Sequence, residues 1–149
     1  MKFNSRKDIL FSFIILGISV FLTGIMFLDI VNGKMEKEGY WPLFLVFGVV
    51  GLLLWLFFGT NYELSEKDGL IYRSGPFKGK INTDRITEII KGKTLWVGFR
   101  PATARKGLII KYDKYNELYI SPKTNETFIN KILELRSGIK ISDGHKELK

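Results

Sequence analysis

Two long apolar runs near the N-terminus dominate the pattern of this chain. The first, Ile9 to Leu28, has twenty residues without a charge, and the second, Trp41 to Phe58, has eighteen. At a rise of 1.5 Å per residue the helices would be about 30 Å and about 27 Å long, which matches the hydrocarbon core of a bilayer. Both runs are apolar on every face, so they do not suit the half-buried helices of a soluble protein. The pattern predicts a transmembrane hairpin within residues 1–59, with spans at about 9–28 and 41–58.

A cleaved signal peptide is the alternative for the first run. Lys2, Arg6 and Lys7 would form its basic start. However, twenty apolar residues exceed the usual apolar region of a signal peptide, and no small-x-small cleavage site follows Leu28. A second apolar run then begins within a dozen residues. We therefore interpret both runs as membrane spans.

From residue 61 onward the pattern changes to short alternating segments separated by turn residues. Asp68-Gly69 is a typical hairpin signal. Leu108, Ile110 and Tyr112 share one face of a strand, as expected for an antiparallel sheet with one buried side. The predicted strands cover residues 62–64, 70–74, 80–82, 86–90, 107–112 and 117–120.

The last predicted element is an amphipathic helix. Ser121 suits its N-cap and Pro122 its first position, and Gly138 suits its stop. Apolar residues recur at helical spacing in this segment, namely Phe128, Ile132, Leu135 and Ile139. Residues 60–141 are therefore expected to form an α+β domain, a small antiparallel sheet capped by a C-terminal helix. The polar residues 142–149 are predicted to be a disordered tail.

Charge distribution predicts the orientation in the membrane. The net charge is +8, and residues 60–149 hold eighteen Lys and Arg against eleven Asp and Glu, a net of +7. Basic residues favour the cytoplasmic side, so we expect a multi-pass protein of the cell membrane with both termini in the cytoplasm. The cations alternate with acids and form no nucleic-acid-binding motif, so no nucleic-acid partner is expected. Gly17 and Gly24 permit close helix contact, which is compatible with a homo-oligomer.

Residue types needed for catalysis are scarce. The chain has no Cys and a single His, His145, in the predicted tail. Gly92-Lys93-Thr94 lacks the glycine spacing and the flanking strand and helix of a phosphate-binding loop. The acids Asp84 and Glu88 have no catalytic partner in the pattern. We expect no enzyme activity, no cofactor and no metal site.

The chain resembles a family of bacterial PH-like (YyaB-like) membrane proteins, which carry a small pleckstrin-homology-type domain behind a two-helix anchor. The resemblance lies in Met1-Lys2-Phe3 with Ser5, in Leu70-Ile71-Tyr72 before Gly75-Pro76-Phe77, and in Ile120-Ser121-Pro122-Lys123 before Phe128. It covers nearly the whole chain. It implies a curved sheet or partial β-barrel capped by the helix, and it implies little about activity because such folds bind lipids, peptides and proteins alike.

A basic surface is the best candidate for a binding site. The irregular stretch 94–106 places aromatic residues beside cations, as a membrane-facing or partner-binding loop would. The alternative is that Trp96 and Phe99 belong to the core of a small domain and the cations are simply solvated. The candidate residues are Lys78, Lys80, Lys91, Lys93, Trp96, Phe99, Arg100, Arg105 and Lys106.

These observations predict a non-catalytic interaction module anchored in the bilayer. Its cytoplasmic domain would bind either an unidentified protein partner or the anionic membrane surface. The alternative function is that of a small immunity-type membrane protein, which protects a cell against a bacteriocin or toxin. The size and the anchor suit that role, but no particular residue points to it.

Overall fold

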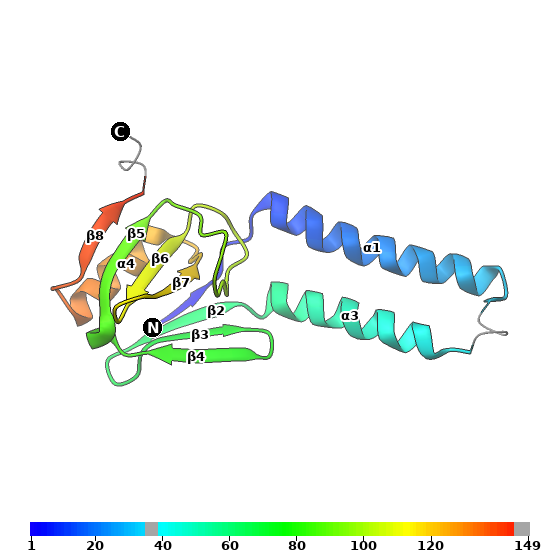
Figure 1. Cartoon of the computed structure of the whole chain (residues 1–149), viewed down its shortest axis with the longest axis horizontal. Coiled ribbons are helices and arrows are strands. Elements are labelled where there is room, and N and C mark those ends of the chain that lie inside the picture. Colours follow the sequence, from blue (N-terminus) through cyan, green and yellow to red (C-terminus); the bar gives the residue numbers. More distant parts are fainter. Residues whose placement is uncertain (35–38, 145–149) are drawn as a thin grey trace.

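The computed structural model describes residues 1–34 and 39–144, and it consists of a helical hairpin and an α+β domain at one end of it (Figure 1). The hairpin is formed by α1 (Ile9–Val31) and α3 (Trp41–Phe58), which lie side by side. Only 11% of the most apolar window of α1 and 6% of that of α3 is buried within the chain. The helices are therefore not core helices of the domain, and they are long and apolar enough to cross a membrane.

The first sheet has four antiparallel strands in the order β1-β2-β3-β4. They are β1 (Lys2–Asn4), β2 (Asn61–Ser65), β3 (Gly69–Ser74) and β4 (Phe77–Ile81). Strands β1 and β2 are neighbours, with Phe3 opposite Tyr62, and the whole hairpin lies between them in the sequence. Sequence analysis assigned residues 1–59 to the hairpin, whereas the structure places Lys2–Asn4 in the sheet of the domain. Both helices are thus fixed to adjacent strands.

The second sheet has the order β7-β6-β5-β8. Its strands are β5 (Ile86–Lys91), β6 (Leu108–Tyr112), β7 (Asn116–Ile120) and β8 (Lys140–Asp143), and a short 3-10 turn, η1 (Thr83–Arg85), precedes β5. Strand β8 pairs parallel to β5. The predicted tail at 142–149 is therefore wrong at its start, because Ser142 and Asp143 belong to this strand. Residues 145–149, including His145, lie outside the described residues.

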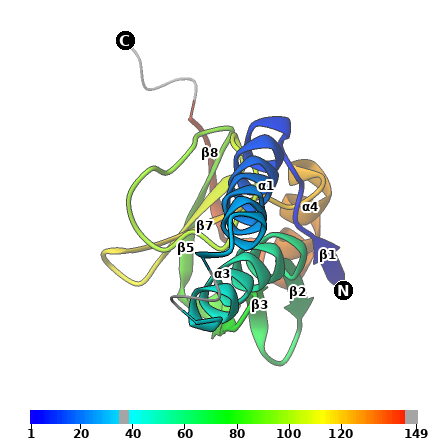
Figure 2. The same cartoon turned by 90° about the vertical axis from the view of Figure 1, so that its right-hand side faces the viewer.

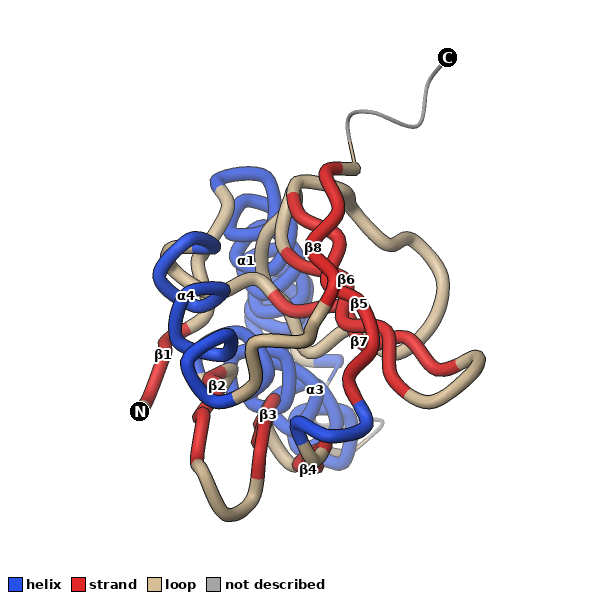
Figure 3. Tube along the Cα trace, turned by 90° about the vertical axis from the view of Figure 1, so that its left-hand side faces the viewer, coloured by secondary structure: helices blue, strands red, loops and turns tan. Residues whose placement is uncertain are grey.

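One apolar core joins both sheets to α4 (Asn125–Leu135). Phe128 of α4 is fully buried and meets the ring of Phe3 edge-on at 5.1 Å. Figure 3 views the domain from the end opposite the hairpin, and it shows α4 beside β1 and β2 with the second sheet on the other side. This arrangement is the predicted α+β fold, in which a helix covers a curved antiparallel framework.

The helix begins later than the sequence predicted. Its N-cap is Thr124, not Ser121, and Pro122 lies before the helix, in an isolated bridge with Ser5. Ser121 is fully buried, and its hydroxyl is 2.9 Å from the Ser5 hydroxyl, so its side chain is not available to a helix N-terminus. Ile139, the last residue of the predicted apolar stripe, lies beyond the end of α4 and belongs to the core.

Candidate functional site

The long loop between β5 and β6, residues 92–107, lies level with the ends of α1 and α3 that are nearest the domain (Figure 1). Seen along the helices, it arcs out to one side of them (Figure 2). Three large apolar side chains at its tip are exposed: Trp96 by 70%, Val97 by 83% and Phe99 by 46%. The sequence left open whether Trp96 and Phe99 are core residues, and the structure places both at the surface.

The ends of this loop are fixed while its tip is open. At the ends, the Gly92 amide donates to the Gly107 carbonyl at 3.0 Å, and the Lys106 amide donates to Thr94 Oγ1 at 2.9 Å. The buried hydroxyl of Tyr119 accepts from the Gly107 amide and donates to the Ala104 carbonyl, both at 2.9 Å. These bonds satisfy buried backbone groups that the irregular chain would otherwise leave unpaired.

A buried hydroxyl cluster, defined here as Ser5, Tyr62, Thr103 and Ser121, ties the second half of the loop to the N-terminal segment. Ser5 Oγ lies 2.9 Å from Thr103 Oγ1 and 3.1 Å from Tyr62 Oη. Burial raises the pKa of Tyr62, so its hydroxyl keeps its proton and donates to the Pro101 carbonyl at 2.6 Å. The cluster thereby holds the segment around Ser5 and the segment around Thr103 in a fixed position relative to each other.

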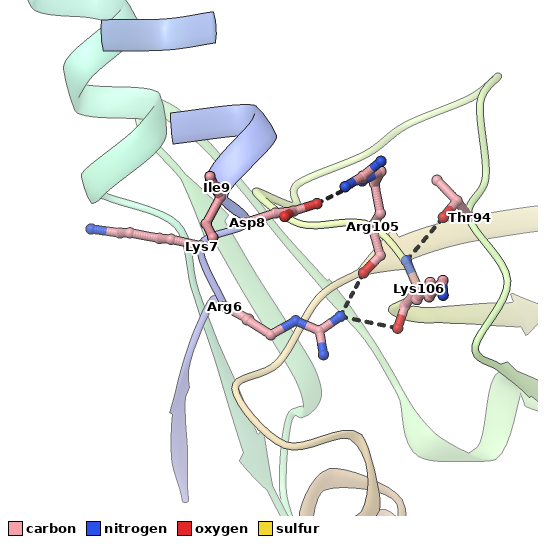
Figure 4. A pocket seen from close by; sticks show the side chains of 7 residues that line it. All are labelled: Arg6, Lys7, Asp8, Ile9, Thr94, Arg105 and Lys106. Carbon is pink, nitrogen blue, oxygen red and sulfur yellow. Dashed lines mark hydrogen bonds and ion pairs between the residues drawn. The ribbon is translucent and has the colours of Figure 1, made fainter. Parts of the chain in front are cut away.

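That fixed arrangement creates a pocket of about 560 Å³ where α1 begins, which we call the juxtamembrane pocket (Figure 4). Arg105 Nε donates to Asp8 Oδ2 at 2.6 Å, and Arg6 Nη2 donates to the Arg105 carbonyl at 2.5 Å and to the Lys106 carbonyl at 3.1 Å. Four cations and one carboxylate line the pocket. Its lining residues are Arg6, Lys7, Asp8, Ile9, Thr94, Arg105 and Lys106.

The electrostatics of the pocket are dominated by its cations. The hydrogen bond from Arg105 holds the pKa of Asp8 below its usual value, and Asp8 in turn raises the pKa of Arg105. Asp8 is therefore ionised at neutral pH, and it offsets the charge of one arginine. Lys7 points away from the other labelled charges (Figure 4), and its Nζ lies 3.9 Å from the centroid of the Phe58 ring at the end of α3. The pocket keeps a net positive charge.

The nine residues predicted for the binding surface do not form one patch. Arg105 and Lys106 line the juxtamembrane pocket. Trp96, Phe99 and Arg100 lie farther along the same loop, and the Arg100 guanidinium stands 5.5 Å from the centroid of the Trp96 ring. These five predicted residues all lie in loop 92–107, on the hairpin side of the domain (Figure 1).

The other four predicted residues are lysines outside these two groups, and of these only Lys93 belongs to the loop. Lys78 and Lys80 are on the edge strand β4, where they line a second groove of about 400 Å³ together with Arg73 and Asp68. Lys91 ends β5, with its Nζ 3.8 Å from a carboxylate oxygen of Glu126, and Lys93 lies next to Gly144. Their placement supports two separate basic surfaces rather than a single one.

Sequence reasoning missed the contribution of Arg6, Lys7 and Asp8. The two cations served only to orient the hairpin, although they stand directly before the first span. Arg6 meets the carbonyls of residues about a hundred positions away. Strand β1, which precedes these three residues, is too short for its sequence to have indicated that this segment joins the domain.

The surroundings of Glu88 do not favour a role as a general acid. Glu88 accepts a hydrogen bond from Ser142, and this bond, together with Lys111 and Lys140, lowers the pKa of its carboxyl. A general acid requires the opposite shift. Within residues 1–34 and 39–144, no three His, Asp or Glu side chains are grouped so that they could hold a metal ion.

Comparison with known proteins gives two matches. A family model described as bacterial PH domain matches residues 60–136, just over half of the chain. An uncharacterised protein of Bacillus subtilis (strain 168), YyaB, is 29% identical over 141 residues, which cover 93% of this chain and 95% of that protein. No solved structure matches the chain significantly.

Proposed function

The chain belongs to the bacterial PH domain family, as its resemblance to YyaB-like proteins predicted, and on that premise we propose that its domain docks on the anionic surface of the membrane that holds its helices. PH domains are in general binding modules without catalytic activity. The proposed role is thus that of a membrane-anchored, non-catalytic interaction module, and its mechanism is the positioning of a binding surface at the bilayer.

The observation that carries this proposal is the composition of loop 92–107 together with its position, level with the ends of α1 and α3 that are nearest the domain (Figure 1). The loop has four cations and no acid, and it exposes Trp96, Val97 and Phe99 beside the ends of the two helices. Aromatic and aliphatic side chains next to cations suit the boundary between lipid headgroups and acyl chains. Contact with lipid would explain why these three apolar side chains are not buried within the protein.

The energetics of such docking are favourable because the domain is already held at the membrane. Each Lys or Arg near an anionic leaflet contributes about 1 kcal/mol. Both helices continue into adjacent strands through short connections, residues 5–8 and residues 59–60. The tether supplies a high effective concentration, so weak contacts are sufficient to orient the domain.

The proposed orientation places the domain and both termini on the cytoplasmic side. The described part of residues 60–149 is rich in cations, and basic segments that flank spans favour that side. The cytoplasmic leaflet is also the one with a negative surface potential. Orientation and docking therefore support each other.

Fluorescence quenching of a single tryptophan tests the docking. The full chain with Trp41→Phe and Trp55→Phe is reconstituted into vesicles of brominated phosphatidylcholine with or without anionic phosphatidylglycerol. Trp96 should be quenched strongly, and more so in the anionic vesicles.

The matched control moves the probe to the opposite end of the domain. Tyr115, in the turn between β6 and β7, is 83% exposed, as Val97 is. In a chain with Trp96→Phe and Tyr115→Trp, the tryptophan at 115 should escape quenching. Equal quenching at both positions, or at neither, would overturn the docking proposal.

A second candidate function is the capture of an acidic, extended protein segment at β4. Strand β4 ends the first sheet, and edge strands can pair with an added strand. The groove beside it carries Arg73, Lys78 and Lys80 against a single acid, Asp68. A photo-crosslinker at position 78 in native membranes should then label one protein, and Arg73→Ala should abolish the label. A crosslink to a second copy of this chain would identify the partner as a homo-oligomer contact, and crosslinks to lipid alone would refute this candidate.

A further inference from the structure

We propose that the juxtamembrane pocket and an apolar groove along α1 form one binding site for a single anionic phospholipid. The phosphate would lie in the pocket, and one acyl chain would lie along the helix. This inference rests on the proposed function only in that both place the start of α1 at the anionic surface of the bilayer. It differs from general docking because it assigns a discrete, stoichiometric site.

The polar half of the site is built before any ligand arrives. Arg6 is held by the carbonyls of Arg105 and Lys106, and Arg105 is held by Asp8. The buried hydroxyl cluster fixes both segments, since Thr103 Oγ1 also donates to the Arg6 carbonyl at 2.8 Å. Preorganised cations lose little conformational entropy on binding, which favours a defined site over diffuse attraction.

Of the cations that line the pocket, Lys106 is the one whose side chain we expect to contact a bound phosphate. Its backbone is fixed at both sides, because its amide donates to Thr94 and its carbonyl accepts from Arg6 and Asn125. The side chain is exposed and lines the pocket. A phosphate between Arg6 and Lys106 would meet positive charge from both, while Asp8 is already neutralised by Arg105.

The apolar half starts where the pocket ends. A groove of about 640 Å³ runs along α1, and Lys7 and Ile9 line both it and the pocket. From Ile9 to Phe21, at a rise of 1.5 Å per residue, the groove is about 18 Å long, close to the depth of one leaflet of a hydrocarbon core about 30 Å thick. A lipid whose phosphate is in the pocket would therefore have its acyl chain beside α1 over the whole leaflet.

Gly17 lies in the lining of this groove, and no protein atom takes up the space beside it. A Cβ placed on Gly17 would have nothing within 4 Å. Beyond it the groove meets a second one, which shares Leu16 and Val20 and extends to Val50 and Leu54 of α3. A free phosphate would use only the polar half, and a protein segment would leave the cationic half without a counter-charge, so a phospholipid is the occupant that suits both halves.

Native mass spectrometry of the full chain tests this site. The protein is released from micelles that contain equal amounts of dioleoyl phosphatidylglycerol and dioleoyl phosphatidylcholine. We expect one phosphatidylglycerol per chain to be retained in preference to phosphatidylcholine. Equal retention of the two lipids, or retention of many copies without a preferred first one, would overturn the inference.

Two variants separate the halves of the site. Lys106→Asn should weaken retention about fivefold, the equivalent of about 1 kcal/mol for one interfacial cation. Asn tolerates the left-handed backbone of this position, where φ is 52°. Lys114→Asn, in the turn at the far end of the domain, is the charge-matched control and should have no effect. Loss that is the same in both variants would contradict a specific role for the pocket.

Gly17→Leu should fill the groove and displace the acyl chain, again with a severalfold loss of retention. Gly48→Leu is its control, because a Cβ at Gly48 on α3 also has nothing within 4 Å and Gly48 lines neither groove. Equal behaviour of the two leucine variants would refute the groove. Full competition by soluble glycerol phosphate would also refute the inference, since it would identify a site for free phosphate.

The outcome also distinguishes this inference from the proposed function. Trp96 quenched by anionic bilayers without preferential lipid retention would leave docking in place and remove the discrete site. Phosphatidylglycerol retained by a chain whose Trp96 is not quenched would support the discrete site and refute the docking.

Discussion

The loop beside the helices and the turns at the opposite end of the domain differ in how their charges are arranged. Loop 92–107 has four cations, no acid and three exposed apolar side chains. In the far turns, residues 66–68 and 113–115, both aspartates meet a cation: Asp68 lies 3.0 Å from Lys80 Nζ, and Asp113 accepts from Arg85 Nε at 2.8 Å. The far turns hold acids beside their cations, whereas loop 92–107 has no acid of its own.

This difference indicates which features serve the fold and which serve a ligand. Loop 92–107 and turn 113–115 connect strands of the same sheet, and three residues are sufficient for that purpose in the turn. Exposed apolar side chains beside a surplus of cations are typical of a binding surface rather than of a connection alone. Their collection at the end of the domain nearest the hairpin is the basis of the docking proposal (Figure 1).

The largest expected effect comes from cutting the link that holds the loop in place. Tyr62→Phe removes the hydroxyl that donates to the Pro101 carbonyl and accepts from the Ser121 amide at 3.0 Å. Two buried backbone groups would lose their partner, so the free energy of unfolding should fall by about 2–4 kcal/mol. Urea unfolding of the full chain in micelles, followed by near-ultraviolet circular dichroism, measures this change.

Tyr72→Phe is the control for that substitution. Tyr72 is half-buried in the neighbouring strand and lies outside the hydroxyl cluster. Its loss should cost about 0.5 kcal/mol or less, as is usual away from buried networks. In Tyr62→Phe, hydrogen exchange should accelerate at residues 102–104 before it does in the far turns. A uniform change over the domain would contradict the role assigned to the cluster.

The framework of the domain was predictable because its signals are local. Asp68-Gly69 and the alternation in residues 108–112 define hairpins within a few residues, and both hairpins are present. The two spans were predictable for the same reason, since length and polarity are local properties. The family resemblance added the partial barrel, which agrees with the single core shared by two sheets.

The candidate site was only half predictable because it is assembled from distant segments. Arg6 and Lys106 are separated by a hundred positions and meet because a short strand, β1, pairs with β2. Three residues are too few to show a strand period. Ser121 looked like a helix cap because capping residues and buried hydroxyls have the same chemistry. Residues 94–106 show neither a strand period nor a helix period, so the exposure of Trp96 could not be predicted from their pattern.

Two glycines, one beside a far turn and one at the tip of loop 92–107, extend the comparison to the backbone. Gly69, the first residue of β3 after the far turn, has φ +74°, and a Cβ there would lie 2.3 Å from the Ile81 carbonyl oxygen. Gly98, at the tip of the loop, has φ +102°, but its Cβ would meet nothing closer than Leu95 Cδ2 at 3.7 Å. Gly69→Ala should therefore cost about 2–3 kcal/mol and Gly98→Ala about 1 kcal/mol, because only the first adds a backbone clash to the strain. The same urea titration measures both, and equal costs would mean that the tip is as tightly packed as the far turn.

The smallest expected effect separates the two ends by their response to membrane charge. Asp8 and Asp113 each accept a hydrogen bond from an arginine that lowers the pKa of the carboxyl. A group with a lowered pKa stabilises the fold above its unfolded pKa, and this contribution is lost as the pH falls through the folded pKa. In neutral bilayers the two acids should thus behave alike, and Arg105→Gln or Arg85→Gln should return the corresponding pKa toward its ordinary value.

An anionic bilayer should make the two acids differ. Its negative surface potential, about −30 to −50 mV, concentrates protons and should raise the apparent pKa of Asp8 relative to neutral bilayers. Asp113, at the end of the domain away from the helices, should not shift, because salt screens the potential within about 10 Å. Carboxyl carbon NMR of the aspartate-labelled full chain in nanodiscs of either composition follows both titrations in one sample. A shift of Asp113 as large as that of Asp8 would mean that the domain lies on its side, and no shift of Asp8 would mean that its pocket does not face charged lipid.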